Sequence, residues 1–388
     1  MSFSIPTAAY VHIPFCRRRC FYCDFPVYVT GPRVTGEASH TISQYVDSIC
    51  HEISITPTFS QPLKTVFFGG GTPSLLSAKQ LEQILSSLEQ RFAMEPKIEI
   101  SMEIDPGTFD LAHIQGYKSA GVNRVSLGVQ TFTPELLKTA GRSHSVEDIF
   151  AAIDIVNQVE IPEFSIDLIS GLPHQSIEQW QNSLTKGVEI APTHISIYDL
   201  TIEPGTVFGR YYQAGDHPLP TDEITVKMYE LGQEILTGAG YEHYEISNYA
   251  KPGHECKHNR VYWQNLAYYG FGMGATSYIE GKRFSRPRRI QEYYQWLNNG
   301  AIIDVEVICV DEELLETIML GMRLAEGLNL GVLVEKFGHQ RVEKIQKCLQ
   351  PYVIPGWVKL TTDRLCLTDP QGFLFSNVVL GDLFAKLG

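Results

Sequence analysis

No run of apolar residues in this 388-residue sequence approaches the roughly 20 residues that a membrane-spanning helix needs. The first residues, Met1–Pro6, lack the basic region and the long apolar core of a signal peptide. An excess of positive charge is also absent. The net charge is −13, which argues against broad electrostatic binding to nucleic acid or anionic lipid. We therefore expect a cytoplasmic protein that binds no nucleic acid and is not integral to a membrane.

Internal repeats and low-complexity tracts are missing as well. A chain of 388 residues with 44% hydrophobic and 19% charged residues is typical of a globular protein with one large and one smaller domain. A disulfide scaffold is excluded by the scatter of five of the eight cysteines. We expect each of these five to be a small buried hydrophobic residue: Cys50, Cys256, Cys309, Cys348 and Cys366.

The other three cysteines lie together. Cys16, Cys20 and Cys23 have the spacing C-x3-C-x2-C and follow a strand-like run, Ala8–His12. Three thiolates so close together suit iron–sulfur or zinc. A complete [4Fe–4S] site uses four protein thiolates, so three would leave one iron free for an exogenous ligand. A zinc site completed by a distant histidine or cysteine is the main alternative. A cytosolic disulfide is disfavoured, and so is chance clustering, because aromatic residues surround the loop.

Six strand-then-helix units make up the first part of the chain. Their alternation predicts βαβ connections and a parallel sheet curled into a full or partial barrel. The strands are expected at Ala8–His12, Thr65–Phe68, Lys97–Ile104, Arg124–Gly128, Phe164–Ile169 and His194–Leu200. Active sites of such barrels form at the carboxyl ends of the strands. The cysteines, a glycine run, Glu103, Gln130 and Asp167 fall at or near those ends, which predicts the site at this rim.

Several of these residues are ambiguous when each is taken alone. The run Gly69–Pro73 either lets backbone approach a ligand or makes a tight βα turn, and it is no P-loop because no Lys-Ser/Thr follows. Glu103 either accepts hydrogen bonds from ribose hydroxyls or is a solvated strand end. The planar fork of Arg142 suits a carboxylate. Gln130 and Asp167, taken alone, indicate no particular function.

The amino-acid composition of the chain changes after a helix expected at Thr221–Leu236. Residues 239–300 are rich in aromatic residues and glycine. From about Asp311, three helical runs and a hairpin of Trp357–Leu360 with Leu365–Leu367 predict a small winged-helix-like domain. We therefore divide the chain into a barrel (1–238), an aromatic and glycine-rich extension (239–300) and a C-terminal domain (301–388).

The C-x3-C-x2-C motif resembles the radical S-adenosylmethionine (SAM) superfamily, and the resemblance covers nearly the whole chain. It implies a partial (β/α)6 TIM-like barrel and a [4Fe–4S] cluster on Cys16, Cys20 and Cys23. In that superfamily the amino and carboxylate groups of SAM chelate the unique iron. The matching positions imply that SAM contacts Tyr10, Tyr22, Gly70, Gly71, Thr72, Glu103, Gln130, Arg142 and Asp167.

Within the superfamily, the sequence resembles the branch that contains oxygen-independent coproporphyrinogen III dehydrogenase (HemN) and the HemW haem chaperones. HemN carries a fourth cysteine two residues after the third, where this sequence has Phe25, and an extra N-terminal segment, whereas Cys16 here is nearly terminal. HemW carries His-Asn-Arg-x-Tyr-Trp, which His258–Trp263 matches. The resemblance therefore favours a haem chaperone with a cluster and exchangeable SAM. Coproporphyrinogen oxidation is the alternative, disfavoured by Phe25, so whether the chain is an enzyme stays open.

The haem chaperone interpretation brings further expectations. His258 can ligate haem iron through a neutral imidazole, although packing is the alternative for a histidine among aromatic residues. Arg283, Arg286, Arg288 and Arg289 can pair with haem propionates or lie in a solvated loop. Arg17–Arg19 can offset the charge of the cluster. The expected partners are haem, haem-accepting proteins such as membrane respiratory enzymes, and an electron donor, and a homodimer is compatible with this scheme.

Overall fold

The computed structural model describes residues 4–31 and 36–387, so part of the N-terminal stretch judged above for a signal peptide, Met1–Phe3, lies outside the described residues. A nine-stranded sheet forms the centre, in the order β11-β1-β4-β5-β6-β7-β8-β10-β9. Neighbouring strands from β1 to β8 are parallel. They are β1 (Ala8–Ile13), β4 (Leu63–Gly70), β5 (Met94–Ile104), β6 (Arg124–Gln130), β7 (Glu163–Ser170) and β8 (His194–Asp199). The predicted parallel, barrel-like sheet is confirmed.

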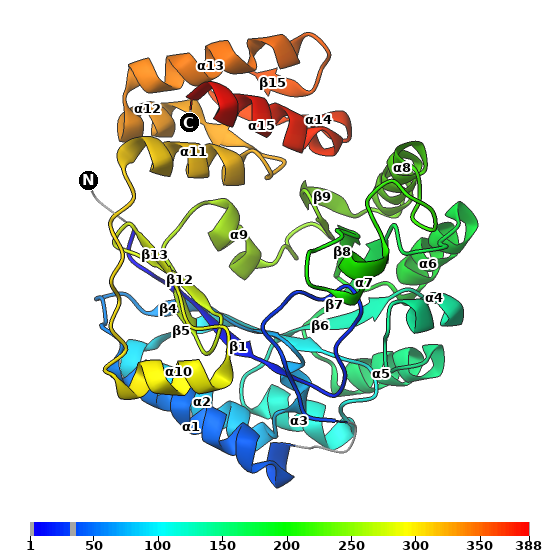
Figure 1. Cartoon of the computed structure of the whole chain (residues 1–388), viewed down its shortest axis with the longest axis vertical. Helices are drawn as coiled ribbons and strands as arrows, with labels where there is room; N and C mark the ends of the chain where they lie inside the picture. Colours follow the sequence, from blue (N-terminus) through cyan, green and yellow to red (C-terminus); the bar gives the residue numbers. More distant parts are fainter. Residues whose placement is uncertain (1–3, 32–35, 388) are drawn as a thin grey trace.

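Helices cover the outer face of this sheet (Figure 1). They are α1 (His40–Ile55), α2 (Ala78–Phe92), α3 (Leu111–Ser119), α5 (Val146–Val159), α6 (Ile177–Ile190) and α8 (Asp222–Gly238). Serine begins four of them: Ser39 caps α1, and Ser77, Ser145 and Ser176 each form a capping box that satisfies free backbone N–H groups. Each helix places an apolar stripe on the sheet, which positions the strand ends at one rim.

The aromatic segment completes both edges of the sheet. β11 (Tyr269–Phe271) pairs in parallel with β1, while β10 (Asn248–Ala250) pairs antiparallel with β8 and with β9 (Glu242–Glu245). The rings of Tyr249 and Phe271 belong to the main hydrophobic core. The aromatic richness of this segment therefore has a packing cause. The domain boundaries at 238 and 300 stay predictions.

A short helix, α9 (Lys257–Trp263), lies on the inner face of the sheet (Figure 1). The buried carboxylate of Glu99, on β5, accepts hydrogen bonds from the backbone N–H groups of Lys257 (3.2 Å) and His258 (3.0 Å). Arg124, on β6, pairs with the same carboxylate at 3.3 Å. Inward-facing charges of the strands thus fix the start of α9 inside the barrel, which sequence periodicity does not reveal.

The C-terminal domain has a hydrophobic core of its own. Its elements run α11 (Val310–Gly321), β14 (Leu328–Asn329), α12 (Leu330–Phe337), α13 (His339–Val353), β15 (Val358–Leu360) and β16 (Arg364–Leu367). The strand order β14-β16-β15 with this helix order is winged-helix-like, as predicted. Two helices that were not predicted, α14 (Gln371–Leu374) and α15 (Ser376–Leu387), follow. The domain meets the barrel through β9, where Ile246 N–H donates to Arg323 C=O and His243 contacts Asp369 at 3.0 Å.

The scattered cysteines differ in exposure. Cys256 is buried, and Cys50, Cys348 and Cys366 are half-buried. For Cys309 the expectation of burial is wrong, because its exposed sulfur instead accepts a hydrogen bond from Glu312 N–H at the start of α11. No helix among the described residues has both the length and the apolar character needed to cross a membrane.

Candidate cofactor site

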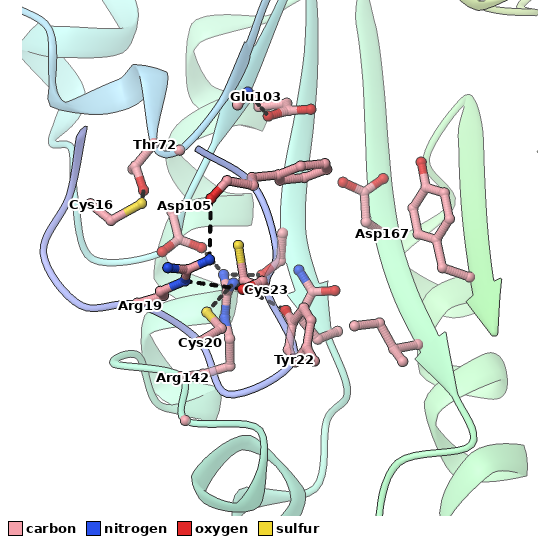
Figure 2. Close-up of a pocket in the computed structure, with 18 of the residues that line it drawn as sticks. Cys16, Arg19, Cys20, Tyr22, Cys23, Thr72, Glu103, Asp105, Arg142 and Asp167 are labelled. Atoms are coloured by element: carbon pink, nitrogen blue, oxygen red, sulfur yellow. Dashed lines mark hydrogen bonds and ion pairs between the residues drawn. The ribbon is translucent and has the colours of Figure 1, made fainter. Parts of the chain in front are cut away.

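A cavity of about 440 Å³ lies at the carboxyl ends of the barrel strands (Figure 2). All three cysteines of the C-x3-C-x2-C motif line it. So do most residues matched to SAM contacts: Tyr22, Gly70, Gly71, Thr72, Glu103, Gln130, Arg142 and Asp167. These residues come from six segments of the chain and meet at one rim. The parallel sheet brings them together because its strands all end on the same side.

The cysteine loop is closed by a short strand pair, β2 (Phe15–Cys16) with β3 (Tyr28–Val29). Thr72 donates a hydrogen bond to Cys16 Sγ at 3.7 Å. Burial raises the pKa of the Cys16 thiol to about 12, and burial also raises the pKa of Cys23. Both thiols are therefore protonated at neutral pH, so metal binding there must release protons.

Arg142 reaches from the segment after α4 (Pro134–Thr139) to the cysteine loop. Its guanidinium donates to Cys20 Sγ (3.3 Å) and the Tyr22 hydroxyl (3.4 Å), and it forms an ion pair with Asp105 (Figure 2). Asp105 was not singled out from the sequence. It follows β5 two residues after Glu103, and this spacing at a strand end is the signal that could have found it. The ion pair holds Arg142 against the cysteine loop.

Two half-buried carboxylates stand on the other side of the cavity. Glu103 accepts a hydrogen bond from Gly70 N–H at 3.0 Å, and Asp167 accepts one from Ser126 Oγ at 2.8 Å. Burial, and next the negative charge of Asp167, raise the pKa of Glu103 to about 7. Burial also raises the pKa of Asp167. A ligand with hydroxyl groups or positive charge would stabilise the ionised forms of both.

The glycines at the end of β4 are required by packing against the cysteine loop. Gly70 has φ +114°, and a Cβ there would lie 2.4 Å from the His12 ring. A Cβ on Gly71 would lie 2.7 Å from the backbone of Pro14. Both glycines also line the cavity. Protein packing alone therefore accounts for these glycines.

Tyr10 does not line the cavity, unlike the other matched aromatic residue, Tyr22. Its hydroxyl hydrogen-bonds His12 Nδ1 at 2.9 Å, and His12 Nε2 lies 2.9 Å from Pro26 C=O. Because a carbonyl only accepts, Nε2 carries the proton and Nδ1 accepts from Tyr10. Burial lowers the pKa of His12 to about 4, so the ring is neutral. His12 thus links Tyr10 to the cysteine loop.

Gln130 occupies an unusual backbone conformation for a residue with a side chain. It has φ +67° and lies where the β6–β7 register shifts. Non-glycine residues in this region cost about 1–3 kcal/mol, and such strain clusters at functional sites. Gln130 is buried at the end of β6 and lines the cavity, so the backbone turns toward the cavity at this residue.

His258 lies deep inside the barrel and not at the rim. Its side chain is fully buried and stacks on Phe67 at 5.2 Å. The two ring nitrogens lie 2.8 Å from Thr65 Oγ1 and 2.9 Å from the Tyr262 hydroxyl. Burial lowers its pKa to about 3, so the ring is the neutral imidazole that haem ligation needs. Both nitrogens are already engaged, however, so ligation requires these hydrogen bonds to open.

Two of the four arginines considered for haem propionates have partners inside the protein. Arg286 forms a buried ion pair with Glu52 at 2.7 Å, and Arg283 pairs with Glu316 at 3.0 Å. Arg283 and Arg286 would have to release these carboxylates to pair with propionates, and that pairing stays a prediction. Arg288 and Arg289 are exposed.

Other residues of the cavity wall were missed from the sequence. They include Ser126, inside β6, and a group at the end of β8 and just after it: Tyr198, Asp199, Leu200, Thr201 and Glu203. The second group stands at or beyond the carboxyl end of a strand, so the rule that located the site would have found it if applied to every strand. Their side chains gave no motif of their own.

The donor set fits a [4Fe–4S] cluster with an open iron. Three soft sulfur donors line one wall of a cavity whose size is in the usual range for small-molecule sites. Among the described residues, no three histidine, cysteine, aspartate or glutamate side chains converge tightly enough to hold a single metal ion. The remaining walls carry the carboxylates and Arg142, which suit a zwitterionic ligand with ribose hydroxyls.

Comparisons with known proteins agree with these features. The family described as the radical SAM superfamily matches residues 10–186, and the HemN C-terminal domain family matches residues 310–375. The haem chaperone HemW of Synechocystis sp. is 47% identical over all of this chain and 98% of its own length. HemW of Bacillus subtilis is 33% identical over 98% of this chain and 100% of its own. HemN of Escherichia coli, a solved radical SAM enzyme, is 23% identical with a TM-score of 0.83, covering 99% of this chain and 91% of HemN.

Proposed function

The chain belongs to the HemW family of the radical SAM superfamily, and from this premise we propose that it is a haem chaperone, which binds haem and transfers it to acceptor proteins. The name haem chaperone is carried by its relatives in Synechocystis sp. and Bacillus subtilis. The observation that carries the proposal is that three cysteines, Arg142 and two half-buried carboxylates surround one cavity in a chain that matches this family over its full length.

Cys16, Cys20 and Cys23 would hold the cluster, and when bound it would supply one-electron redox chemistry and an open iron for SAM. Thr72 and Arg142 already donate to two of the sulfurs, and such hydrogen bonds stabilise thiolates. Because burial raises the pKa of Cys16, loading would release its proton, so a low pH would oppose loading.

Exchangeable SAM would occupy the rest of the cavity. Glu103 and Asp167 would accept hydrogen bonds from its ribose or lie beside its positive charge, and Arg142 would contact its carboxylate. Gly70, Gly71, Thr72, Gln130 and Tyr22 would shape the surrounding wall. Tyr10 would act indirectly, through His12 and the carbonyl of Pro26.

His258 would be the haem ligand, with Tyr262 and Trp263 beside it. The supporting features are the matched motif and a neutral ring whose orientation is fixed by hydrogen bonds. Ligation would require α9 to move away from β4, breaking the contact between His258 and Thr65. Haem binding would therefore be slow compared with binding to an open pocket, because a buried contact must open first.

An experiment that separates haem chaperone from enzyme uses anaerobically reconstituted protein. Haem titration is expected to give stoichiometric binding, and coproporphyrinogen III is expected to remain unconverted. Robust formation of protoporphyrinogen would overturn the proposal in favour of the HemN activity, which the shared fold alone does not support. Phe25, at the position of the fourth HemN cysteine, is expected to block that activity. The proposal also includes haem-accepting proteins (membrane respiratory enzymes among them), an electron donor and a homodimer. Each of these can be tested with the same anaerobically reconstituted protein.

A further inference from the structure

His144 is a buried histidine whose ring makes no hydrogen bond. It lies between α4 and α5, immediately before Ser145, and its side chain is 0% exposed. Neither Nδ1 nor Nε2 has a hydrogen-bond partner among the residues that the structure describes. Buried polar groups almost always have such a partner, because losing water without gaining a partner is costly. His194, for example, is paired on both nitrogens, with Ser165 and Tyr244. Packing alone therefore leaves the ring of His144 unexplained.

The carboxylate of Asp105 lies just outside hydrogen-bond distance of this ring. Asp105 Oδ1 is 3.7 Å from His144 Nδ1, a gap that a small rotation of the Asp105 side chain would close. The carbonyl of Val129 also lies near the ring but completes no hydrogen bond with it. Because burial lowers the pKa of His144 to about 4, the ring is neutral and one nitrogen carries a proton. A carboxylate only accepts, so a proton on Nδ1 makes His144 a donor for Asp105.

Asp105 forms its ion pair with Arg142 at the wall of the cofactor cavity (Figure 2). The same guanidinium donates to Cys20 Sγ (3.3 Å) and to Gly128 C=O (3.2 Å). Only 20% of the Asp105 side chain is exposed, so water would replace a lost partner poorly. In the proposed function Arg142 also contacts the carboxylate of SAM. Two carboxylates then compete for one guanidinium, and Asp105 needs a second donor.

We propose that His144 is a positioning residue for SAM: when the carboxylate of SAM draws Arg142 toward itself, Asp105 turns and accepts a hydrogen bond from His144 Nδ1. The exchange keeps the charge of Asp105 paired and allows Arg142 to hold the ligand. His144 does not line the cofactor cavity, so it acts through Asp105 and Arg142 and not by touching SAM. The inference rests on the proposed function, because it needs SAM in this cavity.

The exchange distinguishes ligands by their carboxylate. SAM and S-adenosylhomocysteine both carry this group, whereas 5′-methylthioadenosine shares their nucleoside and lacks the amino-acid part. Loss of the donor at residue 144 should therefore weaken the binding of the first two ligands only. A purely structural role of His144 would weaken the binding of all three, because a distorted cavity affects the nucleoside as well.

Calorimetric titration of the anaerobically reconstituted protein tests the inference. His144→Phe keeps a ring without a donor, and it is expected to bind SAM and S-adenosylhomocysteine about tenfold or more weakly, the factor typical of a hydrogen bond to a charged group. Its affinity for 5′-methylthioadenosine should equal that of the unmodified chain. His144→Asn, whose amide N–H takes the place of Nδ1–H, should restore most of the affinity for SAM. His144→Gln, whose amide matches the position of Nε2, should not.

The matched control is His113→Phe. His113 hydrogen-bonds Asp110 at 2.7 Å, and neither residue lines the cofactor cavity. This variant removes another histidine beside an aspartate, and it is expected to bind all three ligands as the unmodified chain does. Iron content and the electron paramagnetic resonance spectrum before addition of SAM should be the same in every variant.

Unchanged SAM affinity in His144→Phe, or an equal loss for all three ligands, would overturn the inference. So would equal SAM affinities of His144→Asn and His144→Gln, or a cluster that is altered before SAM is added, since His144 would then support the cysteine loop itself. These results leave the proposed function intact, because the unmodified chain still binds SAM. An unmodified chain that holds its cluster but binds no SAM would overturn the proposed SAM site and this inference together.

Discussion

At the scale of single residues, burial sets the protonation of the groups around the cavity. The charge of Asp167 opposes the ionisation of Glu103, and among the described residues neither carboxylate forms an ion pair with an arginine, unlike Asp105. The site without ligand therefore holds a proton that a positively charged or hydroxyl-rich ligand would displace. This has consequences for both ligand binding and stability.

The affinity for SAM should depend on the ionisation of Glu103. Because its pKa is about 7 in the free protein, SAM is expected to bind up to about tenfold more weakly at pH 6 than at pH 8. Glu103→Gln should bind SAM weakly and with little dependence on pH. Calorimetric titrations across this pH range check both points, and a pH-independent affinity of the unmodified protein would contradict the role of Glu103.

The same shift predicts a pH-dependent stability. The pKa of Glu103 is higher in the folded protein (about 7) than its ordinary value of 4.5, so the folded state holds more protons between these limits. The free energy of unfolding should therefore fall as pH rises from 4.5 toward 7. Urea unfolding of Glu103→Gln should lack this contribution. Burial also raises the pKa of Glu245 to about 7, so Glu245 contributes to the pH dependence of stability in both proteins. The difference in unfolding free energy between the unmodified protein and Glu103→Gln therefore gives the contribution of Glu103 alone.

Substitution of His258 should affect both haem and stability. His258→Ala is expected to abolish tight haem binding. It should also lower the free energy of unfolding by about 2–5 kcal/mol, because it leaves a cavity and two buried hydroxyls without partners. Thr65→Val keeps the imidazole but removes one hydrogen bond, so haem should associate faster. Haem titrations and stopped-flow measurements check this. Unchanged haem affinity in His258→Ala would show that the ligand lies elsewhere.

At the scale of secondary-structure elements, the parallel strands and their connecting helices were predictable. In each strand-then-helix unit, the hydrophobic period, the helix-capping residues and the turn residues all indicate the same element. Ser77 and Ser176, for example, begin the expected helices with capping boxes. The edge strands and α9 were not predictable, because their sequences carry aromatic residues and glycine without a clear period. Only the assembled sheet decides where they lie. Similarly, Asp105 acquires its role from Arg142, which is distant in sequence.

The attachment of α9 depends on one buried carboxylate. Glu99→Ala removes the acceptor for two backbone N–H groups and leaves Arg124 with a buried charge that has lost its nearest partner. We expect the free energy of unfolding to fall by about 3–5 kcal/mol. Urea unfolding checks this against Glu82→Ala, an exposed site on α2 that should change stability by less than about 0.5 kcal/mol. Equal effects of the two substitutions would contradict the role of Glu99.

At the scale of the whole molecule, the chain has two separate hydrophobic cores, and the contacts between them include ion pairs as well as Tyr229 and Ile246, which pack against the C-terminal core from the barrel side. The ion pairs Arg260–Glu326 and Arg283–Glu316 cross between the barrel side and the C-terminal domain, and both are partly exposed. Such pairs contribute little stability at a protein surface, roughly 0–1 kcal/mol each. The two cores are therefore expected to unfold separately.

Tryptophan fluorescence can follow each core by itself, because Trp180 is buried in the barrel and Trp357 packs on the C-terminal core. Urea unfolding of Trp357→Phe should report mainly the barrel, and that of W180F/W263F/W296F, which keeps only Trp357, mainly the C-terminal domain. We expect different midpoints for the two variants. Coincident transitions, also by circular dichroism, would mean that the domains unfold as one unit.

The central claim is that three cysteines hold an iron–sulfur cluster whose open iron binds SAM. The most direct measurement is the electron paramagnetic resonance spectrum of anaerobically reconstituted, reduced protein before and after addition of SAM. We predict a [4Fe–4S] signal that changes when SAM is added and is absent from Cys16→Ser, Cys20→Ser and Cys23→Ser. A spectrum that SAM leaves unchanged, or a protein that takes up zinc in place of iron, would contradict this account.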